Sequence, residues 1–260
     1  MFIIKDLSAS LKYLNFIRYK SYVDLKLRFN RTLIGSFWPF ISISIFVLGW
    51  GFAASSLFSV DPSDFLPYFC TGYITWLFLS SNVSESCNIF ISQTHILLTR
   101  KIPFSVFIFI QIVKNFFIFL HYLLFFFIIF LYFNLDFNYN FFLLIPGFFI
   151  FFFLLYFFIF FWGTLCTRFR DLGEATNSVL SIAFFLSPII WPIDKLSGYA
   201  LKIFVDFNPL YHLISVIRLP LMGESPELFS YFYLLILLIT QIVFTFILLN
   251  KTKEGIKFWL

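Results

Sequence analysis

Three basic residues, Lys26, Arg28 and Arg31, lie just before the first long hydrophobic run of this 260-residue sequence. A guanidinium group is planar and presents a fork of N–H donors, which suits bidentate contacts with phosphate oxygens. If the hydrophobic run enters a membrane, these side chains lie at the depth of the lipid headgroups. The pattern therefore predicts a phosphate-binding cluster. A positive anchor that only holds the segment against anionic lipid fits the same residues.

Two more ionisable residues, Glu85 and Lys114, lie inside hydrophobic runs. A charge at membrane depth is costly and indicates either a function or a paired partner. The two residues are nearly equidistant in sequence from a turn near Arg100, so adjacent antiparallel helices would bring them to similar depth. We expect a structural ion pair, and the alternative is a polar lining of a pathway.

Tyrosine and tryptophan side chains recur near the ends of the hydrophobic runs. Their rings combine a flat apolar face with a hydrogen-bonding edge. They form either a belt at the membrane interface or a stacking track for sugar rings. The candidates for such a track are Trp38, Tyr73, Trp76, Trp162 and Trp191.

Motifs for nucleotide hydrolysis and for metal or nucleophilic catalysis are missing from the sequence. It contains no Gly-x-x-x-x-Gly-Lys-Ser/Thr loop, no His-Glu-x-x-His and no nucleophile elbow. The histidines, His95, His121 and His212, fall in different segments and match no ligand spacing, and the cysteines also lack metal spacing. We expect no catalytic residue, no metal and no cofactor in this chain.

The elements that must position these residues are hydrophobic helices. The sequence is 61% hydrophobic, 25% aromatic and only 12% charged, whereas soluble domains contain about 25% charged residues. A spanning helix needs about 20 apolar residues. Six runs meet or approach this length, and they predict six transmembrane helices at 37–58, 66–90, 104–133, 141–165, 177–192 and 228–249.

Residues 1–35 form a basic segment with one apolar helical face, made by Ile4, Leu7, Leu11 and Leu14. A helix of this kind lies in the membrane interface rather than spanning the bilayer. The net charge of +5 is therefore a topology signal and not evidence of nucleic-acid binding.

Lysines and arginines are concentrated in 1–35, 91–103, 166–176 and the tail at 250–260. Of the connections that alternate with them, 59–65 and 134–140 contain none and 193–227 contains three, which are Lys195, Lys202 and Arg218. Basic residues accumulate in cytoplasmic loops. We therefore expect both termini to be cytoplasmic.

On this topology the segment 193–227 is external. Its apolar pieces, 200–205 and 210–221, are too short to cross a membrane, which is typical of re-entrant or interfacial helices. Such backbone must be buried in protein or line a cavity, so the segment predicts a gate at the outer mouth. A surface hairpin is the alternative. The gate residues would be Pro188, Asn208, Pro209 and Arg218.

A charged island, Arg168 to Glu174, separates two apolar runs and marks a cytoplasmic loop. Arg168 and Asp171 are three residues apart and could pair on a helical turn. The short fifth span follows directly and links this loop to Ser187 and Pro188, which makes it a candidate lever for the gate.

Four stretches occur in order along the chain: the basic helix and Leu-Gly-x-x-Trp-like pattern at 24–38, Leu97 to Pro103, Arg168 to Ile190, and Asn208 to Arg218. Together they resemble the ABC-2 type permeases that export polysaccharides, which are the membrane subunits of O-antigen, capsule and teichoic-acid exporters. The resemblance covers nearly the whole chain.

This resemblance implies a single all-α integral membrane domain over residues 1–260. It comprises an amphipathic interfacial helix (1–35), a six-span region (37–249) with external re-entrant helices between the fifth and sixth spans (193–227), and a cytoplasmic tail (250–260). It also implies a homodimer in a bacterial inner membrane, with two copies of a separate ABC ATPase that bind ATP and Mg.

The resemblance further implies roles for individual residues. Gln93, Thr94, His95, Arg100 and Lys101 would form a coupling helix for the ATPase. Arg168, Arg170 and Asp171 would make a second contact with it, or form a helix end at the cytoplasmic mouth. The substrate would be a polysaccharide on a polyprenyl pyrophosphate lipid, with O-antigen favoured over capsule or teichoic acid. The cluster of Lys26, Arg28 and Arg31 would then bind the pyrophosphate.

Two other classes of function remain open at this point. A membrane-embedded enzyme of glycan assembly would be expected to carry large external loops rich in Arg, His or acidic residues. An ion-coupled transporter would be expected to carry inverted repeats and midplane ionisable groups. The sequence offers neither feature clearly.

Overall fold

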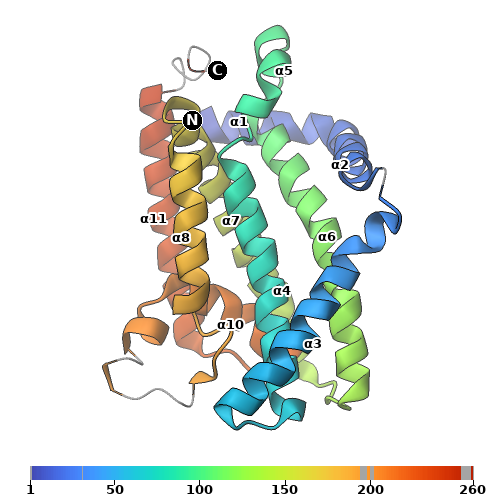
Figure 1. Ribbon diagram of the computed structural model, residues 1–260. Coiled ribbons are helices and arrows are strands. Elements are labelled where there is room, and N and C mark those ends of the chain that lie inside the picture. Colours follow the sequence, from blue (N-terminus) through green and yellow to red (C-terminus); the bar gives the residue numbers. More distant parts are fainter. Residues whose placement is uncertain (1, 31, 194–197, 200–201, 253–258, 260) are drawn as a thin grey trace.

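The computed structural model describes residues 2–30, 32–193, 198–199, 202–252 and 259, and every regular element in that part of the chain is a helix (Figure 1). This confirms the predicted all-α class. Long helices run side by side in one bundle: α3 (Trp38–Phe58), α4 (Pro62–Ser86), α6 (Phe104–Tyr132), α7 (Leu144–Arg168), α8 (Leu172–Leu186) and α11 (Leu228–Thr252).

Four of the predicted spans are helices long and apolar enough to cross a membrane, and they contain α3, α6, α7 and α11. The chain is a multi-pass membrane protein. Of the other two helices, α4 is as long as its neighbours, but Ser, Thr, Asn and Glu residues lower its hydropathy.

The fifth predicted span, 177–192, was placed too late in the chain. Helix α8 has only 15 residues, starts at Leu172 and ends at Leu186. Ser187 is extended (φ −93°, ψ 145°) because a residue before proline is disfavoured in the helical region. The run from Pro188 to Pro192 is therefore a loop and not the end of a span.

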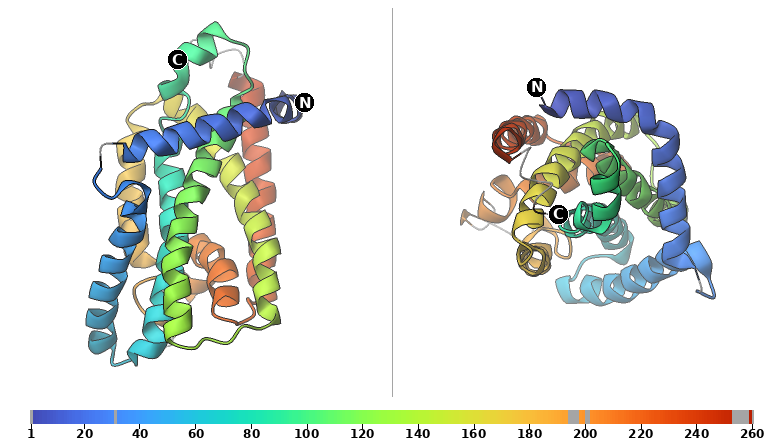
Figure 2. Two further views of the ribbon diagram at one scale, coloured as in Figure 1. Left: turned by 90° about the vertical axis from the view of Figure 1, so that its right-hand side faces the viewer. Right: turned by 90° about the horizontal axis from the view of Figure 1, so that it is seen from above.

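The basic N-terminal segment crosses one end of the bundle instead of running along it (Figure 2). It consists of α1 (Phe2–Ser10), a 3-10 turn (Leu11–Tyr13) and α2 (Leu14–Phe29). Seen from above, the two helices follow adjacent sides of the bundle. The prediction of one interfacial helix as far as residue 35 was too simple, because the segment bends and α2 ends before Asn30, which is extended.

The carboxylate of Asp6 holds α1 on the first turn of α6. It accepts hydrogen bonds from the backbone N–H groups of Phe104 (3.0 Å) and Ser105 (2.8 Å), and from the Ser105 hydroxyl. An anion at a helix N-terminus satisfies free N–H donors and the helix dipole. Burial raises the pKa of the Asp6 carboxyl, and the Ser105 and Phe104 hydrogen bonds lower it in part.

A short helix projects beyond the same end of the bundle. It comprises a 3-10 turn (Ile91–Gln93) and α5 (Thr94–Thr99), which joins α4 to α6 (Figures 1 and 2). We call this the α5 end of the bundle.

The opposite end, here the α10 end, carries the helices between α8 and α11. They are a π-helical turn (Lys202–Asp206) and α10 (Pro209–Leu221). Helix α10 confirms the helix expected at 210–221, whereas residues 200 and 201 of the other expected piece lie outside the described residues. Asn208 caps α10, since its Oδ1 accepts from the Leu210 N–H at 2.9 Å, and Pro209 fits the first turn.

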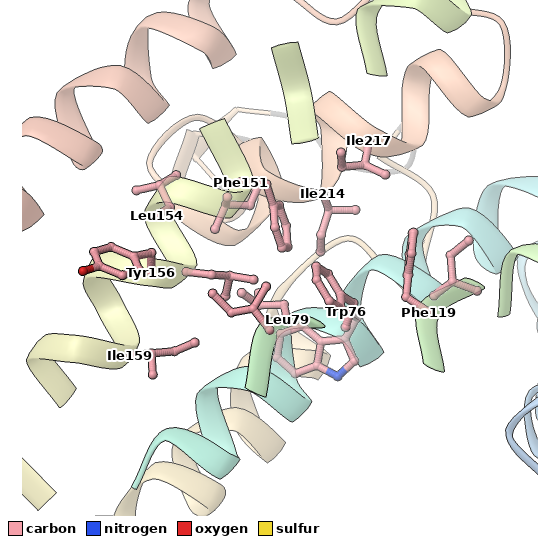
Figure 3. Packing of buried hydrophobic residues seen from close by; sticks show 14 of the residues in the cluster. Trp76, Leu79, Phe119, Phe151, Leu154, Tyr156, Ile159, Ile214 and Ile217 are labelled. Carbon is pink, nitrogen blue, oxygen red and sulfur yellow. The ribbon is translucent and has the colours of Figure 1, made fainter. Parts of the chain in front are cut away.

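Helices α4, α6, α7 and α10 meet in a core of buried aromatic and branched side chains (Figure 3). Trp76 from α4, Phe119 from α6, Phe151 from α7 and Ile214 from α10 all belong to this core. Inside a bilayer, apolar burial alone does not drive helices together, so close packing supplies the stabilisation. The core fixes α4, and α4 supplies half of the residues that line the site described next.

Candidate functional site

An open groove of about 570 Å³ runs along the face of the bundle between α3, α4 and α8. Its lining combines aromatic rings, hydroxyl groups and, at one end, charged side chains. The lining residues are Arg28, Phe46, Tyr73, Trp76, Leu77, Ser80, Ser81, Ser84, Glu85, Asn177, Leu180, Ser181, Phe184 and Phe185.

Aromatic rings from three helices form one section of the groove. Phe46 of α3 stacks on Tyr73 of α4 with ring centroids 4.5 Å apart. Phe184 of α8 lies 5.9 Å from the Tyr73 ring and 5.7 Å from the Trp76 ring. Rings in this arrangement present apolar faces and edges to a ligand in the groove.

Hydroxyl and amide groups line the next section, towards the α5 end. Ser80, Ser81 and Ser84 come from α4, and Asn177 and Ser181 come from α8. Residues three or four apart share one face of a helix, so each helix directs a continuous polar stripe into the groove. The Ser84 hydroxyl donates to Asn177 Oδ1 at 2.6 Å and joins the two stripes.

A cluster of charges closes the groove at its α5 end. Lys114 Nζ lies 2.8 Å from Glu85 Oε2, so the two residues expected to pair do so. Asn115 Nδ2 donates to the same oxygen at 2.9 Å. Among the described residues, Glu85 Oε1 receives only a longer contact, 3.4 Å from Arg28 Nη1. The predicted pair is therefore part of a cluster that also includes α2.

Buried amides extend this cluster between α4 and α6. Gln111 Nε2 donates to the Asn82 carbonyl at 2.8 Å, and Asn115 Nδ2 donates to Asn82 Oδ1 at 3.2 Å. Buried polar groups of this kind fix the register of two helices because a shift would leave donors unsatisfied.

A second cavity of about 360 Å³ lies on the other side of Glu85, beneath α2. It shares Ser84 and Glu85 with the groove and is otherwise lined mainly by polar groups. Lys20 and Asp24 of α2, which pair at 2.7 Å, face it. Its further lining residues are Asn88, Ile89, Ser92, Gln93, Phe107, Ile110, Gln111 and Lys114.

The predicted phosphate-binding cluster is only partly assembled in the structure. Lys26 and Arg28 lie exposed in the last turn of α2. Arg28 contacts Glu85 and lines the groove, whereas Lys26 does not line it. Arg31 lies outside the described residues.

The predicted aromatic track divides into two groups. Tyr73 and Trp76 line the groove, but the other three candidates do not. Trp38 lies exposed at the start of α3. Trp162 donates to the Thr176 hydroxyl at 2.8 Å and faces a separate apolar cavity, and Trp191 donates to the Phe185 carbonyl at 3.0 Å.

The predicted gate residues meet at the α10 end. Tyr68 of α4 donates to the carbonyls of Pro188 (3.0 Å) and Trp191 (3.3 Å). Asn208, beyond its capping role, donates to the Ser187 hydroxyl at 3.2 Å. These contacts tie the loop after α8 to α4 and to the start of α10.

Arg218 of α10 is nearly inaccessible, with 2% of its surface exposed. Its guanidinium carbon lies 4.0 Å from the centre of the Tyr68 ring, a cation–π contact. The guanidinium packs against Gly72, where a Cβ atom would lie 2.0 Å from Nη2. Its Nε and Nη2 atoms have no hydrogen-bond partner in the described structure. The absence of a side chain at Gly72 in α4 therefore makes room for the Arg218 guanidinium.

The residues expected to contact an ATPase lie at the α5 end. His95, Arg100 and Lys101 are exposed, and Gln93 and Thr94 are half-buried. They fall on or beside the projecting helix α5, which leaves their side chains near the tip of the molecule.

The charged island is a tight turn between α7 and α8, with Arg168, Arg170 and Asp171 exposed. The expected pair of Arg168 with Asp171 is wrong. The ion pairs among the described residues do not include it, and the Arg168 guanidinium lies over the rings of Phe169 (5.2 Å) and Trp259 (5.1 Å) instead. Helix α7 continues to Arg168 and α8 starts only at Leu172, so the two residues do not share a helical turn.

Much of the groove is not evident from the sequence. Phe46, Phe184 and the polar stripes of α4 and α8 were not selected as site residues. The sequence does carry one signal of the groove. Three serines, Ser80, Ser81 and Ser84, lie on one face of an otherwise apolar span in α4. The two phenylalanines could not be separated from the many other phenylalanines of the chain by sequence alone.

Comparison with known protein families gives one match over most of the chain. Residues 23–222 match the family described as ABC-2 type transporter. The comparison with curated individual proteins gave no match. The matched segment starts within α2 and ends just after α10, so it contains every residue of the groove and of its charged end.

Proposed function

Because this chain belongs to the ABC-2 type transporter family, we propose that it is the permease subunit of an ABC exporter for a lipid-linked polysaccharide. The proposed cargo is a polysaccharide on a polyprenyl pyrophosphate carrier, such as O-antigen. The family pairs such membrane domains with an ABC ATPase. Energy is therefore supplied by a separate partner chain, and this chain is not itself the enzyme.

The observation that carries the choice of cargo is the composition of the groove. Its aromatic section, Phe46, Tyr73, Trp76 and Phe184, is followed by hydroxyl and amide stripes on α4 and α8. Aromatic faces suit the apolar faces of sugar rings, and side-chain hydroxyls and amides exchange hydrogen bonds with sugar hydroxyls. A purely lipidic cargo would not need such stripes.

The groove is open on one side, which supports a homodimer that completes it. Large apolar side chains beside it on α3 and α8 are exposed, among them Ile45, Phe52, Ile182 and Phe185. A second copy placed against this face would cover them and turn two open grooves into an enclosed path.

We place the α5 end in the cytoplasm of a bacterial cell and the α10 end outside the inner membrane. The basic residues of α1, α2 and the α5 region support this orientation. Helix α5, with His95, Arg100 and Lys101, then projects towards the ATPase. Closure of the ATPase dimer would move the helices as rigid bodies and carry the cargo outward along the groove.

The test replaces Tyr73 by Leu, which keeps the apolar bulk but removes the flat ring and its hydroxyl. ATP-driven export of the lipid-linked glycan should fall about tenfold, since stacking and hydrogen bonding along the path are lost. Tyr132→Leu is the matched control, because Tyr132 lies exposed at the end of α6, away from the groove. Equal export by both variants would argue against the groove as the path.

A further inference from the structure

The two oxygens of the Glu85 carboxylate are held unequally. Oε2 accepts from Lys114 Nζ at 2.8 Å and from Asn115 Nδ2 at 2.9 Å. In the part of the chain that the structure describes, Oε1 has only the 3.4 Å contact with Arg28 Nη1. Glu85 is thus fixed to α6 and only loosely attached to α2.

Arg28 is the exchangeable partner in this cluster. Its side chain is 46% exposed, against 19% for Lys114. A guanidinium has several N–H donors, and the 3.4 Å contact with Glu85 is its one hydrogen bond within the described part of the chain. Two cations share one carboxylate, so positive charge is in excess at this end of the groove.

Removing Arg28 from Glu85 would not leave the carboxylate unpaired. Lys114 and Asn115 would still hold the other oxygen. This matters because a buried charge left without any partner is strongly destabilising. The contact between Arg28 and Glu85 can therefore break with little loss of stability.

The position of Glu85 also indicates which kind of ligand could open it. Glu85 forms part of the wall between the groove and the cavity beneath α2, with Arg28 on the groove side and Lys114 on the cavity side. A basic helix that crosses the end of the bundle lies at headgroup depth. Phosphate groups are the anions present there. A phosphate can accept a bidentate contact from a guanidinium, which is stronger than a single long contact with a carboxylate.

We propose that the Glu85 carboxylate is an internal anion that occupies a phosphate site at the end of the groove until the diphosphate headgroup of a lipid displaces it from Arg28. Glu85 stays paired with Lys114 throughout, and Arg28 turns from the carboxylate to the incoming phosphate. Lipids without a strongly charged headgroup do not displace it. The cluster therefore selects which lipids enter the groove. The identity of the lipid carrier rests on the proposed function.

The test uses a double substitution that removes the internal anion without changing net charge. In Glu85→Gln/Lys114→Met, Arg28 loses its competitor and no buried lysine is left unpaired. The full chain in nanodiscs of zwitterionic lipid is titrated with inorganic pyrophosphate and, separately, with farnesyl diphosphate. The double variant should bind both probes about tenfold more tightly than the wild type, the size of one charge-assisted hydrogen bond.

The matched control is Lys20→Met/Asp24→Asn, which neutralises the neighbouring ion pair of the same cavity and also preserves net charge. It should leave both affinities within about twofold of the wild type, because among the described residues neither Lys20 nor Asp24 forms an ion pair or hydrogen bond with Arg28. Adding Arg28→Gln to the Glu85→Gln/Lys114→Met variant should abolish the gain.

Three results would overturn the proposal: no gain in the double variant, an equal gain in the control, or a gain that survives Arg28→Gln. A gain for inorganic pyrophosphate alone would overturn the assignment to a lipid headgroup. These measurements need neither the ATPase nor transport. A failure of export with this binding pattern intact would therefore count against the proposed function and not against the site.

Discussion

At the scale of single residues, the unusual feature is a buried cation that packs directly against a glycine. Arg218 fills the space beside Gly72 that any side chain would occupy, and its charge is met by the Tyr68 ring. Since Tyr68 also binds the carbonyls of Pro188 and Trp191, this contact joins α10, α4 and the loop after α8. The three segments are therefore held together at the α10 end of the bundle.

Gly72→Ala should lower the free energy of unfolding by about 1–3 kcal/mol, because the new Cβ forces the Arg218 guanidinium out of its place. Thermal unfolding in detergent measures this. Gly49→Ala is the control, since nothing lies within 4 Å of a Cβ at Gly49, and it should be neutral or stabilising by up to about 1 kcal/mol. Combining Gly72→Ala with Arg218→Met should restore much of the loss. If Gly72→Ala unfolds at the wild-type temperature, the close packing is not present in the protein.

Asp6 gives a pH dependence with a definite sign. Burial raises the pKa of its carboxyl above 3.8 in the folded protein, so the folded state binds a proton more tightly than the unfolded state. The contribution of Asp6 to stability is therefore greatest at acid pH and falls as pH rises from 3.8 through the raised pKa. At pH values above the raised pKa, the contribution of Asp6 to stability no longer changes with pH.

Asp6→Asn should remove this slope, because the amide does not titrate. At neutral pH the substitution should also lower the free energy of unfolding by about 1 kcal/mol, which is typical of a lost helix cap. One of the two carboxylate oxygens becomes an NH₂ group, which faces N–H donors and cannot accept hydrogen bonds from them. The measurement is the difference in unfolding free energy between wild type and variant across pH 4–7. A difference that does not change with pH would contradict the assignment.

At the scale of elements, α5 is the part that extends furthest from the bundle on one side. Its sequence neighbours Arg100 and Lys101 are exposed and have no ion-pair partner among the described residues. A charged surface on a short projecting helix can insert into a partner without disturbing the core. This fits the transmission of motion from an ATPase to α4 and α6, which α5 connects.

Arg100→Glu/Lys101→Glu should reduce co-purification of the ATPase at least about tenfold, since reversing these charges would place like charges against each other at the docking surface. The melting temperature of the isolated chain should not change. Asp64→Lys, a charge reversal at the first turn of α4 near the α10 end, is the control and should leave the complex intact. Loss of the complex in the control, or its retention in the α5 variant, would contradict the role given to α5.

The bounds of a helix could be predicted from the sequence where a long hydrophobic run determines them. The bounds of α3, α6, α10 and α11 lie within a few residues of the expected ones, because a long apolar run has few alternatives. The pairing of Glu85 with Lys114 could be predicted because adjacent antiparallel helices would place both residues at a similar depth in the membrane. The bend between α1 and α2 could not, since the Asp6 contact with α6 is tertiary.

The groove was harder to predict for a physical reason. Phenylalanines that face lipid, core and groove are chemically identical, and only packing separates Phe46 and Phe184 from the rest. Trp162 and Trp191 resembled groove residues in type, but their indole N–H groups are used in structural hydrogen bonds. The role of Arg28 beside Glu85 depends on α2 crossing the bundle, which periodicity does not encode.

At the scale of the whole molecule, the two ends of the groove are built differently. The α5 end has an excess of positive charge that can exchange partners, and the α10 end is held by buried hydrogen bonds and a cation–π contact. Charge recognition at the α5 end would suit loading of the proposed cargo, and opening of the contacts at the α10 end would suit its release. The short helix α8 lines the groove between these ends and has few buried side chains.

The most direct test of this account is transport by the purified complex. The chain is isolated with its co-purifying ATPase, reconstituted in proteoliposomes that contain a lipid-diphosphate-linked polysaccharide, and the glycan reaching the far side is measured with and without ATP. The account predicts glycan transfer that requires ATP and the ATPase and is about tenfold slower with Tyr73→Leu. Transfer without the ATPase, transfer driven by an ion gradient, or no transfer of the glycan at all would contradict it.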